Sequence, residues 1–341
     1  MKKGLAESHQ GMTLLSVKDL KKQYGRAMAL AGVSLQVHAG DIYGFLGRNG
    51  AGKSTTIKIL AGLVRPDQGE VSFFGSASAH PDHMIRKRVG FLIENPSFLP
   101  TLNAVENLCC HQILRGRSGP HALQEVRQIL ERVGLSDVAH RKVGGYSTGM
   151  RQRLGLAQAF LGMPEIVVLD EPLNGLDPEG IYSMRKMILE MAAERGTTFF
   201  ISSHILAEVE QMCNRLGFVA HGKVVAEGSL DELGATGWLL IRVAQHIEAL
   251  QTIGMQWPQS EPHLTEDRRI ALRLDDNKHP ELIRFLVAKG YDLYEVMRKP
   301  RSLEETFMTL TTDRAEGTGQ CAEEESRSDP HPLTHDDGSA P

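Results

Sequence analysis

The glycine-rich segment Gly47–Ser54 constrains the fold of this chain more than any other part of the sequence. It reads Gly-Arg-Asn-Gly-Ala-Gly-Lys-Ser, follows the apolar run Asp41–Leu46 and precedes the helix-like stretch Lys53–Leu63. In such a strand–loop–helix unit, backbone N–H groups and the positive end of the helix face phosphate oxygens. We therefore expect an α/β fold in which this loop binds the phosphates of a nucleotide.

Each part of this loop has an expected role. The glycines let the backbone close around phosphate oxygens without Cβ clashes, Lys53 supplies a cation to the β- and γ-phosphates, and the Ser54 hydroxyl can ligate Mg²⁺. A glycine-rich turn with an exposed lysine is the alternative, and the strand–loop–helix setting argues against it. The residues expected to bind ATP here are Gly47, Asn49, Gly50, Ala51, Gly52, Lys53, Ser54 and Thr55.

A second motif places a pair of carboxylates after a buried strand. The apolar run Ile166–Leu169 is followed directly by Asp170 and Glu171. We expect Asp170 to be held rigidly, where it contributes to the Mg²⁺ site, and Glu171 to orient and polarise a water as general base. Acidic residues at a helix N-terminus would give the same pattern. The phosphate loop elsewhere in the chain favours the catalytic interpretation.

Alternating strand and helix patterns organise the rest of the chain. Val33, Leu35 and Val37 alternate with polar residues as in a half-buried strand. The β-branched and aromatic runs at 166–169 and 197–202 indicate buried, mostly parallel strands. Between about 101 and 162 only helical periodicity is present, so this stretch is predicted to be a helical insertion.

We predict four segments in this chain of 341 residues. They are a dispensable extension at 1–11, a nucleotide-binding domain at 12–234, a small α+β accessory domain at 235–312 and a disordered acidic tail at 313–341. In the accessory domain we expect strands at 238–243, 269–274 and 291–297 and helices at 280–289 and 303–310.

Charge and composition exclude some classes of function. The tail carries eight Asp and Glu against two Arg, a balance of −6, so a total of −4 leaves +2 for the rest of the chain. A body this close to neutral has no general electrostatic footprint for nucleic acid, and we expect no nucleic-acid partner. Cys109, Cys110, Cys213 and Cys321 have neither C-x-x-C spacing nor histidines nearby at the intervals of a metal site, so reduced thiols are expected.

The hydropathy pattern predicts a cytosolic protein. No stretch approaches the roughly 20 apolar residues that cross a bilayer. The first ten residues lack the apolar centre of a secretory signal. A role at a membrane would therefore depend on a partner protein.

The segment Tyr146–Leu154 carries a resemblance to a known family. It reads Tyr-Ser-Thr-Gly-Met-Arg-Gln-Arg-Leu and resembles the signature motif of the ATP-binding-cassette (ABC) ATPases, usually written Leu-Ser-Gly-Gly-Gln. Ser147 and Gly149 are retained, and a hydroxyl and an unobstructed N–H at a helix start form an anion site. An ordinary N-cap serine would have the same position. The resemblance implies a P-loop cassette with a parallel-sheet core, an antiparallel β subdomain and a helical insertion.

Other family motifs follow in order, and the resemblance covers about 14–229. Asn174–Asp177 is similar to the D-loop, which in this family touches the opposite subunit, and Asp177 is expected among the ATP-binding residues. His204 is similar to the switch histidine near the γ-phosphate, which makes it a catalytic candidate beside Glu171. Tyr24 is similar to the aromatic residue that stacks on adenine. An ordinary capping or packed residue is the alternative for His204 and Tyr24.

The segment Gly90–Pro96 departs from most of the family. It carries Glu94 where most relatives have a Gln that contacts Mg²⁺ and the membrane partner. We expect Glu94 near Mg²⁺, because a carboxylate beside the γ-phosphate is costly unless a metal neutralises it. This loop and the segment 146–153 resemble the bacitracin and lantibiotic self-protection exporters, whose ATPase is a free-standing chain serving a separate permease. Leu303–Thr311 is similar to the closing helix of such subunits.

The resemblance implies a homodimer whose active sites are shared. Ser147 and Gly149 of one copy would face ATP held by Lys53 and Ser54 of the other. The chain would lie on the cytoplasmic face of a bacterial cell membrane, where it powers export of a peptide antibiotic or another drug through a multi-spanning permease. The alternative is a soluble ABC ATPase acting on ribosomes or DNA. An importer subunit and an unrelated P-loop enzyme are further interpretations.

Overall fold

The structure is a computed structural model, and it describes residues 11–77, 83–93, 96–234, 238–265 and 267–299. Most of the predicted extension, the predicted tail at 313–341, Glu94, Cys321 and the predicted closing helix lie outside the described residues. No helix in the described ranges is both long and apolar enough to cross a membrane.

A six-stranded, mostly parallel sheet forms the centre of the larger unit. Its strands are β3 (Ile42–Leu46), β6 (Val89–Leu92), β7 (Ile166–Asp170), β8 (Thr198–Ser203), β9 (Arg215–Ala220) and β10 (Lys223–Ser229). They lie in the order β10-β9-β3-β8-β7-β6, and only the pair β9–β10 is antiparallel. Every residue of β3, β7 and β8 is buried, which is the pattern of a parallel sheet covered on both faces.

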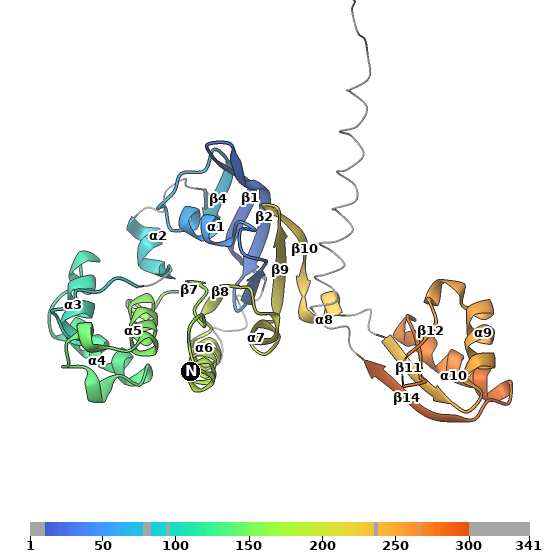
Figure 1. Cartoon of the computed structure of the whole chain (residues 1–341). Coiled ribbons are helices and arrows are strands. Elements are labelled where there is room, and N and C mark those ends of the chain that lie inside the picture. The colour runs from blue at the N-terminus through green and yellow to red at the C-terminus, as the bar shows by residue number, and fades with distance from the viewer. Residues whose placement is uncertain (1–10, 78–82, 94–95, 235–237, 266, 300–341) are drawn as a thin grey trace, which may run out of the picture.

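Helices cover the two faces of this sheet. Along β7, Val167 and Leu169 belong to one apolar cluster with helix α6 (Pro178–Arg195). The alternate residues Ile166 and Val168 belong to another cluster, which includes helix α1 (Lys53–Leu60). Figure 1 shows α1 on one side of the central strands and α6 on the other. The period-2 alternation of side chains thus fixes which helix packs on which face.

A second, antiparallel sheet packs over α1. Its strands are β1 (Thr13–Tyr24), β2 (Ala27–His38), β4 (Gln68–Phe73) and β5 (Ser76–Ala77), in the order β2-β1-β4-β5. Val17, Leu35 and Val71 of this sheet share one apolar cluster with Ile57 of α1. Only one face of this sheet is apolar, so its sequence alternates instead of running continuously.

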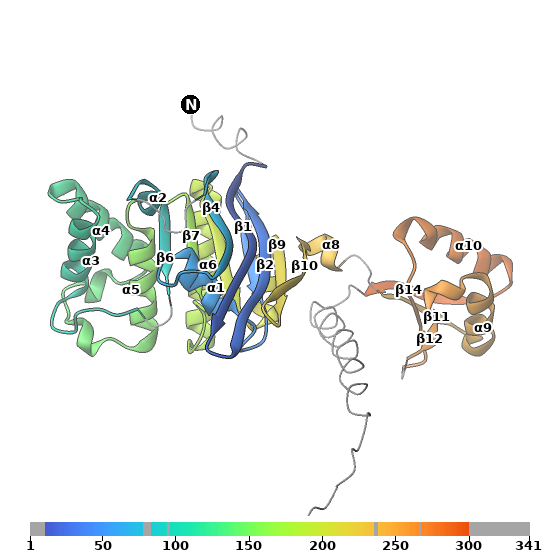
Figure 2. The same ribbon diagram turned by 90° about the horizontal axis from the view of Figure 1, so that it is seen from above.

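The predicted helical insertion is present between residues 101 and 162. It contains α3 (Ala104–Leu114), α4 (Pro120–Arg132) and α5 (Thr148–Phe160), and α2 (His83–Arg88) precedes it. Figures 1 and 2 both show α3, α4 and α5 together at one end of the larger unit. The buried carboxylate of Glu125 ties them together, because it accepts from Gln112 Nε2 at 2.9 Å and from the Gly162 N–H at 2.6 Å.

The residues after 237 form a small α+β unit with a core of its own. Its elements are β11 (Trp238–Val243), α9 (His246–Gln256), β12 (His263–Leu264), β13 (Ile270–Leu272), α10 (His279–Ala288) and β14 (Leu293–Lys299). The four strands pair in the order β12-β13-β11-β14. Leu239 and Ile241 of β11 pack with Ile253 of α9 and Leu282 of α10. The proposed boundaries of the accessory domain stay a prediction.

The predicted fold class is confirmed, and the differences concern single elements. The helix predicted at 53–63 ends at Leu60, because Gly62 adopts φ +73° and the Leu63 N–H bonds back to the Lys58 carbonyl. Helix α9 and strands β9 and β10 were not predicted from the sequence. Strand β13 is shorter than the predicted run 269–274.

The contact between α5 and β6 generates a prediction about stability. A Cβ added at Gly90 of β6 would lie against the Ala159 carbonyl oxygen and 3.0 Å from its carbon. We expect Gly90→Ala to lower the free energy of unfolding of the larger unit by about 3 kcal/mol, because backbone has to move. Urea unfolding followed by circular dichroism measures this change.

The control variant is Gly254→Ala in α9, where an added Cβ meets only Pro262 Cγ at 3.6 Å. It should stabilise its own unit by about 0.5–1 kcal/mol. Both tryptophans of the chain, Trp238 and Trp257, lie in the small unit, so their fluorescence reports that unit separately. Equal unfolding midpoints for Gly90→Ala and the unmodified chain would contradict the predicted clash.

Candidate active site

The phosphate loop packs closely against strands of both sheets. It connects β3 to α1, with Gly50 at φ +83° and Gly52 at φ +109°. A Cβ at Gly52 would lie 2.6 Å from Leu30 Cδ2 and 2.8 Å from the Ala29 carbonyl oxygen. A Cβ at Gly47 would lie 2.5 Å from the backbone oxygen of Val219. The glycines are therefore required by close packing as well as by backbone conformation.

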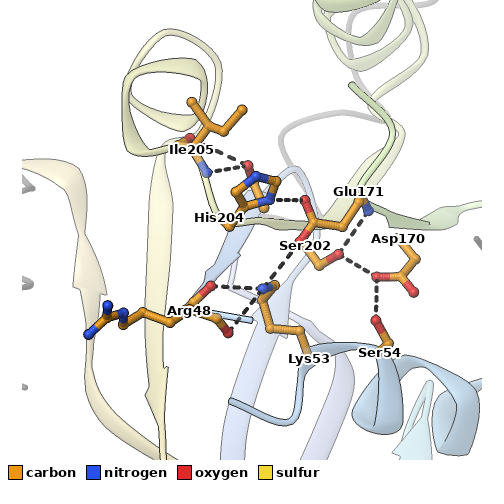
Figure 3. A network of polar contacts seen from close by, with 10 residues as sticks. Arg48, Lys53, Ser54, Asp170, Glu171, Ser202, His204 and Ile205 are labelled. Carbon is orange, nitrogen blue, oxygen red and sulfur yellow. Dashed lines mark hydrogen bonds and ion pairs between the residues drawn. The ribbon is translucent and has the colours of Figure 1, made fainter. Parts of the chain in front are cut away.

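The ammonium group of Lys53 lies inside this loop. Its side chain is 5% exposed, and Nζ donates to the carbonyl oxygens of Gly47 at 2.7 Å and Arg48 at 3.4 Å. Nζ also lies 3.2 Å from Glu171 Oε1 (Figure 3). A buried ammonium needs such partners, because desolvation of an unpaired charge is costly. The ion pair neutralises the charge of the Lys53 ammonium.

Asp170 and its neighbours form a polar network at the ends of β7 and β8. Asp170 and Ser202 are direct partners in the parallel register. Ser202 Oγ donates to Asp170 Oδ1 at 2.6 Å and accepts from the Glu171 N–H at 2.9 Å (Figure 3). Ser54 Oγ at the start of α1 donates to the same Oδ1 at 3.4 Å. One serine thus fixes both the aspartate carboxylate and the backbone that carries the glutamate.

Glu171 is held by contacts on both carboxylate oxygens. Its backbone has φ +47°, in the left-handed region, which turns the chain out of β7. Oε1 faces Lys53, while Oε2 lies 2.8 Å from His204 Nδ1 (Figure 3). His204 follows the last residue of β8, and its side chain is 35% exposed. Glu171 and His204, which are 33 residues apart, therefore meet at one edge of the sheet.

The oxygens of Ser54 and Asp170 fit a magnesium ion. A hydroxyl and a carboxylate are hard oxygen donors, and Mg²⁺ bound with a nucleotide takes few protein ligands and completes its shell with phosphate oxygens and water. Ser54 and Asp170 already lie within hydrogen-bond distance of each other. Glu94, the third predicted Mg²⁺ ligand, lies outside the described residues.

Glu208 adds a further carboxylate beside this network. Helix α7 (Leu206–Glu210) carries it, and it lines a small pocket with Glu171, His204 and Ser203. Burial raises the pKa of Glu208, and the nearby Glu171 carboxylate adds to that rise while His204 opposes it. Ser202 and Glu208 were both missed by the analysis of the sequence. The run of two serines before His204 was the available signal for Ser202.

Ser147 and Gly149 stand at the exposed start of α5. Ser147 caps this helix by accepting from the Met150 N–H at 3.2 Å, and its side chain is exposed. A Cβ at Gly149 would meet Leu176 Cδ2 at 3.6 Å, which places α5 beside the segment before α6. The capping interpretation of Ser147 is therefore correct, and capping leaves the exposed helix start available to an anion.

Asp177 and Tyr24 are exposed in the chain taken alone. Asp177 caps α6 by accepting from the Gly180 N–H at 2.9 Å. Tyr24 ends β1 and is 49% exposed. The described hydrogen bonds of Asp177 and Ser147 join them to their own helices, so the structure does not join them to the Lys53 loop. The roles predicted for all of these residues remain predictions.

The family model and the relatives that match this chain agree on one family. The family model described as "ABC transporter" matches residues 30–174. The chain is 37% identical over 300 residues to the bacitracin transport ATP-binding protein BcrA of Bacillus licheniformis, covering 87% of this chain and 97% of that protein. It is 38% identical over 218 residues to the lantibiotic transport ATP-binding protein SrtF of Streptococcus pyogenes, covering 64% of this chain and 92% of that protein.

A solved structure described as the dimeric structure of MJ0796, a bacterial ABC transporter cassette, matches with a TM-score of 0.58 at 25% identity. The match covers 64% of this chain and 99% of that one. This chain belongs to the ATP-binding proteins of ABC transporters. The cassette fold and the resemblance to the bacitracin and lantibiotic proteins are confirmed, and the family makes the chain an ATPase.

The position of Ser202 in this ABC ATPase generates a prediction. Ser202→Ala removes the hydroxyl that joins Asp170 to the Glu171 backbone. We expect the kcat for ATP hydrolysis to fall about tenfold or more, because a hydrogen bond to a charged group is lost. Steady-state phosphate release measures the change.

Ser203→Ala is the matched control. Ser203 is also buried on the same strand, but its hydroxyl accepts from the Ile205 N–H at 3.0 Å. We expect a loss in kcat of about threefold or less for this variant. Equal losses in the two variants would show that the effect comes from the strand end in general and not from the Asp170 contact.

Proposed function

We propose that this chain is the ATP-hydrolysing subunit of an exporter that carries a peptide antibiotic or a related drug through a separate permease. The convergence of Lys53, Glu171 and His204 within hydrogen-bond distance supports the hydrolytic part. The match to nearly the whole length of a bacitracin transport ATP-binding protein supports the export part. No observation favours the alternative role on ribosomes or DNA.

Binding of ATP would change the partner of Lys53. In the structure the ammonium is paired with Glu171 Oε1. A γ-phosphate, which carries more charge than a carboxylate, competes for this cation. Glu171 would then be available to accept a proton from a water, and His204 would hold Oε2 in place at 2.8 Å.

Ser54 and Asp170 are the residues that would hold Mg²⁺. The ion supplies charge neutralisation at the β- and γ-phosphates when it is bound. Ser202 keeps the Asp170 carboxylate oriented toward that position through its 2.6 Å hydrogen bond. We include Glu94 in this proposal as the ligand from the loop between β6 and α3.

The exposed start of α5 supports a homodimer. Ser147 and the Gly149 N–H lie at the exposed start of α5, and a helix N-terminus attracts an anion. In a dimer they would face the triphosphate held by Lys53 of the other copy, with Asp177 close by. The dimeric state described for the MJ0796 cassette is consistent with this arrangement.

A groove between β6 and the helical insertion is the proposed docking site of the permease. Its volume is about 470 Å³, and Phe91, Ile93 and Leu114 contribute to an apolar lining. Leu114 is 84% exposed, and Lys87 and Arg115 add positive charge to the groove. An amphipathic cytoplasmic segment of the permease with an acidic residue would match this surface. In the sequence, Glu94 comes directly after the lining residue Ile93, which would connect docking to the proposed Mg²⁺ site.

This assignment places the chain on the cytoplasmic face of a bacterial membrane, attached through its partner. The transport proteins among its relatives are bacterial. ATP and Mg²⁺ are the small molecules that the proposed mechanism requires.

The test uses a tagged Glu171→Gln chain in the native cells. Loss of the carboxylate should preserve ATP binding and keep the dimer closed, because the general base is absent. After gentle solubilisation in Mg-ATP we expect a multi-spanning membrane protein at near-equal amounts, identified by mass spectrometry. Co-expressed with that permease, the unmodified chain should raise the inhibitory concentration of bacitracin or a lantibiotic, and the variant should not.

Lys53→Ala is the control, since it removes the cation that holds the triphosphate and should form no closed dimer. Rapid ATP turnover by Glu171→Gln would contradict the assignment of the general base. Recovery of ribosomal or nucleic-acid companions without a membrane protein would contradict the transport role.

The proposed docking groove between β6 and the helical insertion leads to a separate prediction about permease binding. In the Glu171→Gln background, Leu114→Glu should reduce recovery of the permease at least about tenfold, because a charge is buried in an apolar contact. Met255→Glu is the matched control, since Met255 is also 84% exposed but lies in the small unit. Unchanged recovery with Leu114→Glu would exclude this groove as the docking site.

A further inference from the structure

Tyr24 stands at the tip of a β-hairpin with little to hold it. It is the last residue of β1 and pairs with Ala27 of β2 across the turn formed by Gly25 and Arg26. The residue is 49% exposed. A two-stranded tip of this kind is only marginally stable by itself. A residue that binds a flat base needs a fixed ring, so the tip requires support from elsewhere.

Asp67 supplies contacts to the three residues before Tyr24. Its N–H donates to the Lys21 carbonyl at 2.9 Å. Its Oδ2 accepts from the Gln23 N–H at 2.7 Å, and its Oδ1 lies 2.8 Å from Lys22 Nζ. Asp67 directly precedes β4, so it ties the end of β1 to a neighbouring strand. One side chain thus fixes both the backbone and a side chain beside the tyrosine.

Lys22 connects Asp67 to the aromatic ring. Its Nζ lies 5.5 Å from the centroid of Tyr24, and its side chain is only 16% exposed. A cation within about 6 Å of a ring centroid is attracted by the ring's electrons. The Lys22 ammonium therefore lies on one side of the ring, while half of the residue's surface stays open to solvent.

The hairpin is also fixed to the phosphate loop. Lys22 pairs with Leu30 in the β1–β2 register, and Leu30 and Ala29 are the residues that a Cβ at Gly52 would meet. Ala27 lies three residues from Leu30, which is roughly 10 Å along a strand. The hairpin tip therefore lies roughly 10 Å beyond the contact between Leu30 and the phosphate loop. A nucleotide bound by its phosphates in that loop can reach the tip with its base.

We propose that Asp67 is a positioning residue for the nucleotide base, because it holds Lys22 against Tyr24 and leaves the opposite face of the ring for adenine. This inference rests on the proposed function, which gives Tyr24 the adenine. Asp67 stays ionised at neutral pH, since the hydrogen bonds from Lys22 and from the Gln23 N–H lower its pKa. Asp67 acts through Tyr24 and touches no part of the nucleotide.

A substitution that weakens binding of the base and one that weakens binding of the phosphates change different measured constants. Weaker stacking should raise the KM for ATP and leave kcat unchanged, because the hydrolytic residues lie elsewhere. It should also leave the binding of inorganic tripolyphosphate unchanged, since that ion has no base. A general loss of structure near the loop would weaken both.

The experiment uses the full chain with Asp67→Asn and, as a second variant, Asp67→Ala. We expect each to raise the KM for ATP about threefold to tenfold with kcat within about twofold of its original value. The inhibition constant of tripolyphosphate should not change. Asp67→Glu should restore part of the affinity, because it keeps the charge opposite Lys22. Thermal unfolding of each variant checks that the fold is kept, as expected for a side chain that is 47% exposed.

Asp19→Asn is the matched control. Asp19 also pairs with a lysine of β1, at 3.3 Å from Lys21, but it is five residues from Tyr24. This variant should leave the KM for ATP unchanged. A rise equal to that of Asp67→Asn would overturn the proposal, as would an equal loss of tripolyphosphate binding in the Asp67 variants.

Tyr24→Ala separates this inference from the function on which it rests. If Tyr24→Ala raises the KM for ATP while both Asp67 variants leave it unchanged, the positioning role is wrong and the adenine role stands. If Tyr24→Ala itself has no effect, the adenine role is wrong and the inference about Asp67 falls with it. ATPase activity and permease recovery would persist in either case.

Discussion

The contact between the Lys53 ammonium and the Glu171 carboxylate is the interaction on which the rest of the site depends. Lys53 is 5% exposed, and its cation is satisfied by Glu171 and by two carbonyl oxygens of the loop. A buried charge without such partners would cost several kcal/mol or change its protonation. The same contact holds the carboxylate that we propose as the general base. The ion pair therefore stabilises an arrangement in which Lys53 and Glu171 bind each other.

The sheet makes this contact possible. Glu171 follows β7 and His204 follows β8, and the two strands are parallel neighbours in a fixed register. Parallel strands deliver their carboxyl ends to one edge, where the loop after β3 also lies. Ser202 then sets the finer geometry, because it joins the Asp170 carboxylate to the backbone N–H of Glu171. A shift in this register by one residue would turn each of these side chains to the opposite face.

The proposed contact surfaces lie on separate parts of this chain. The hairpin tip with Tyr24, the start of α5 with Ser147 and the groove lined by Leu114 belong to three different elements around the central sheet. Each of the three is exposed in the single chain. The hairpin packs against the phosphate loop, because Ala29 and Leu30 of β2 lie close to Gly52. In the proposed mechanism, binding of a nucleotide, a second copy and a permease would be coupled through the central sheet.

The sequence by itself determined the fold class, the phosphate loop and the pair of carboxylates, because glycine spacing, side-chain period and a buried strand before Asp170 are local features of the chain. It left α9, β9 and β10 unpredicted, and Ser202, Glu208 and Asp67 were not selected from it. Those residues matter through partners that are 31 to 46 positions away, such as Glu171 for Ser202 and Lys21 for Asp67. Only the tertiary structure decides such partners, because strand order and register bring distant residues together and no local pattern encodes that pairing.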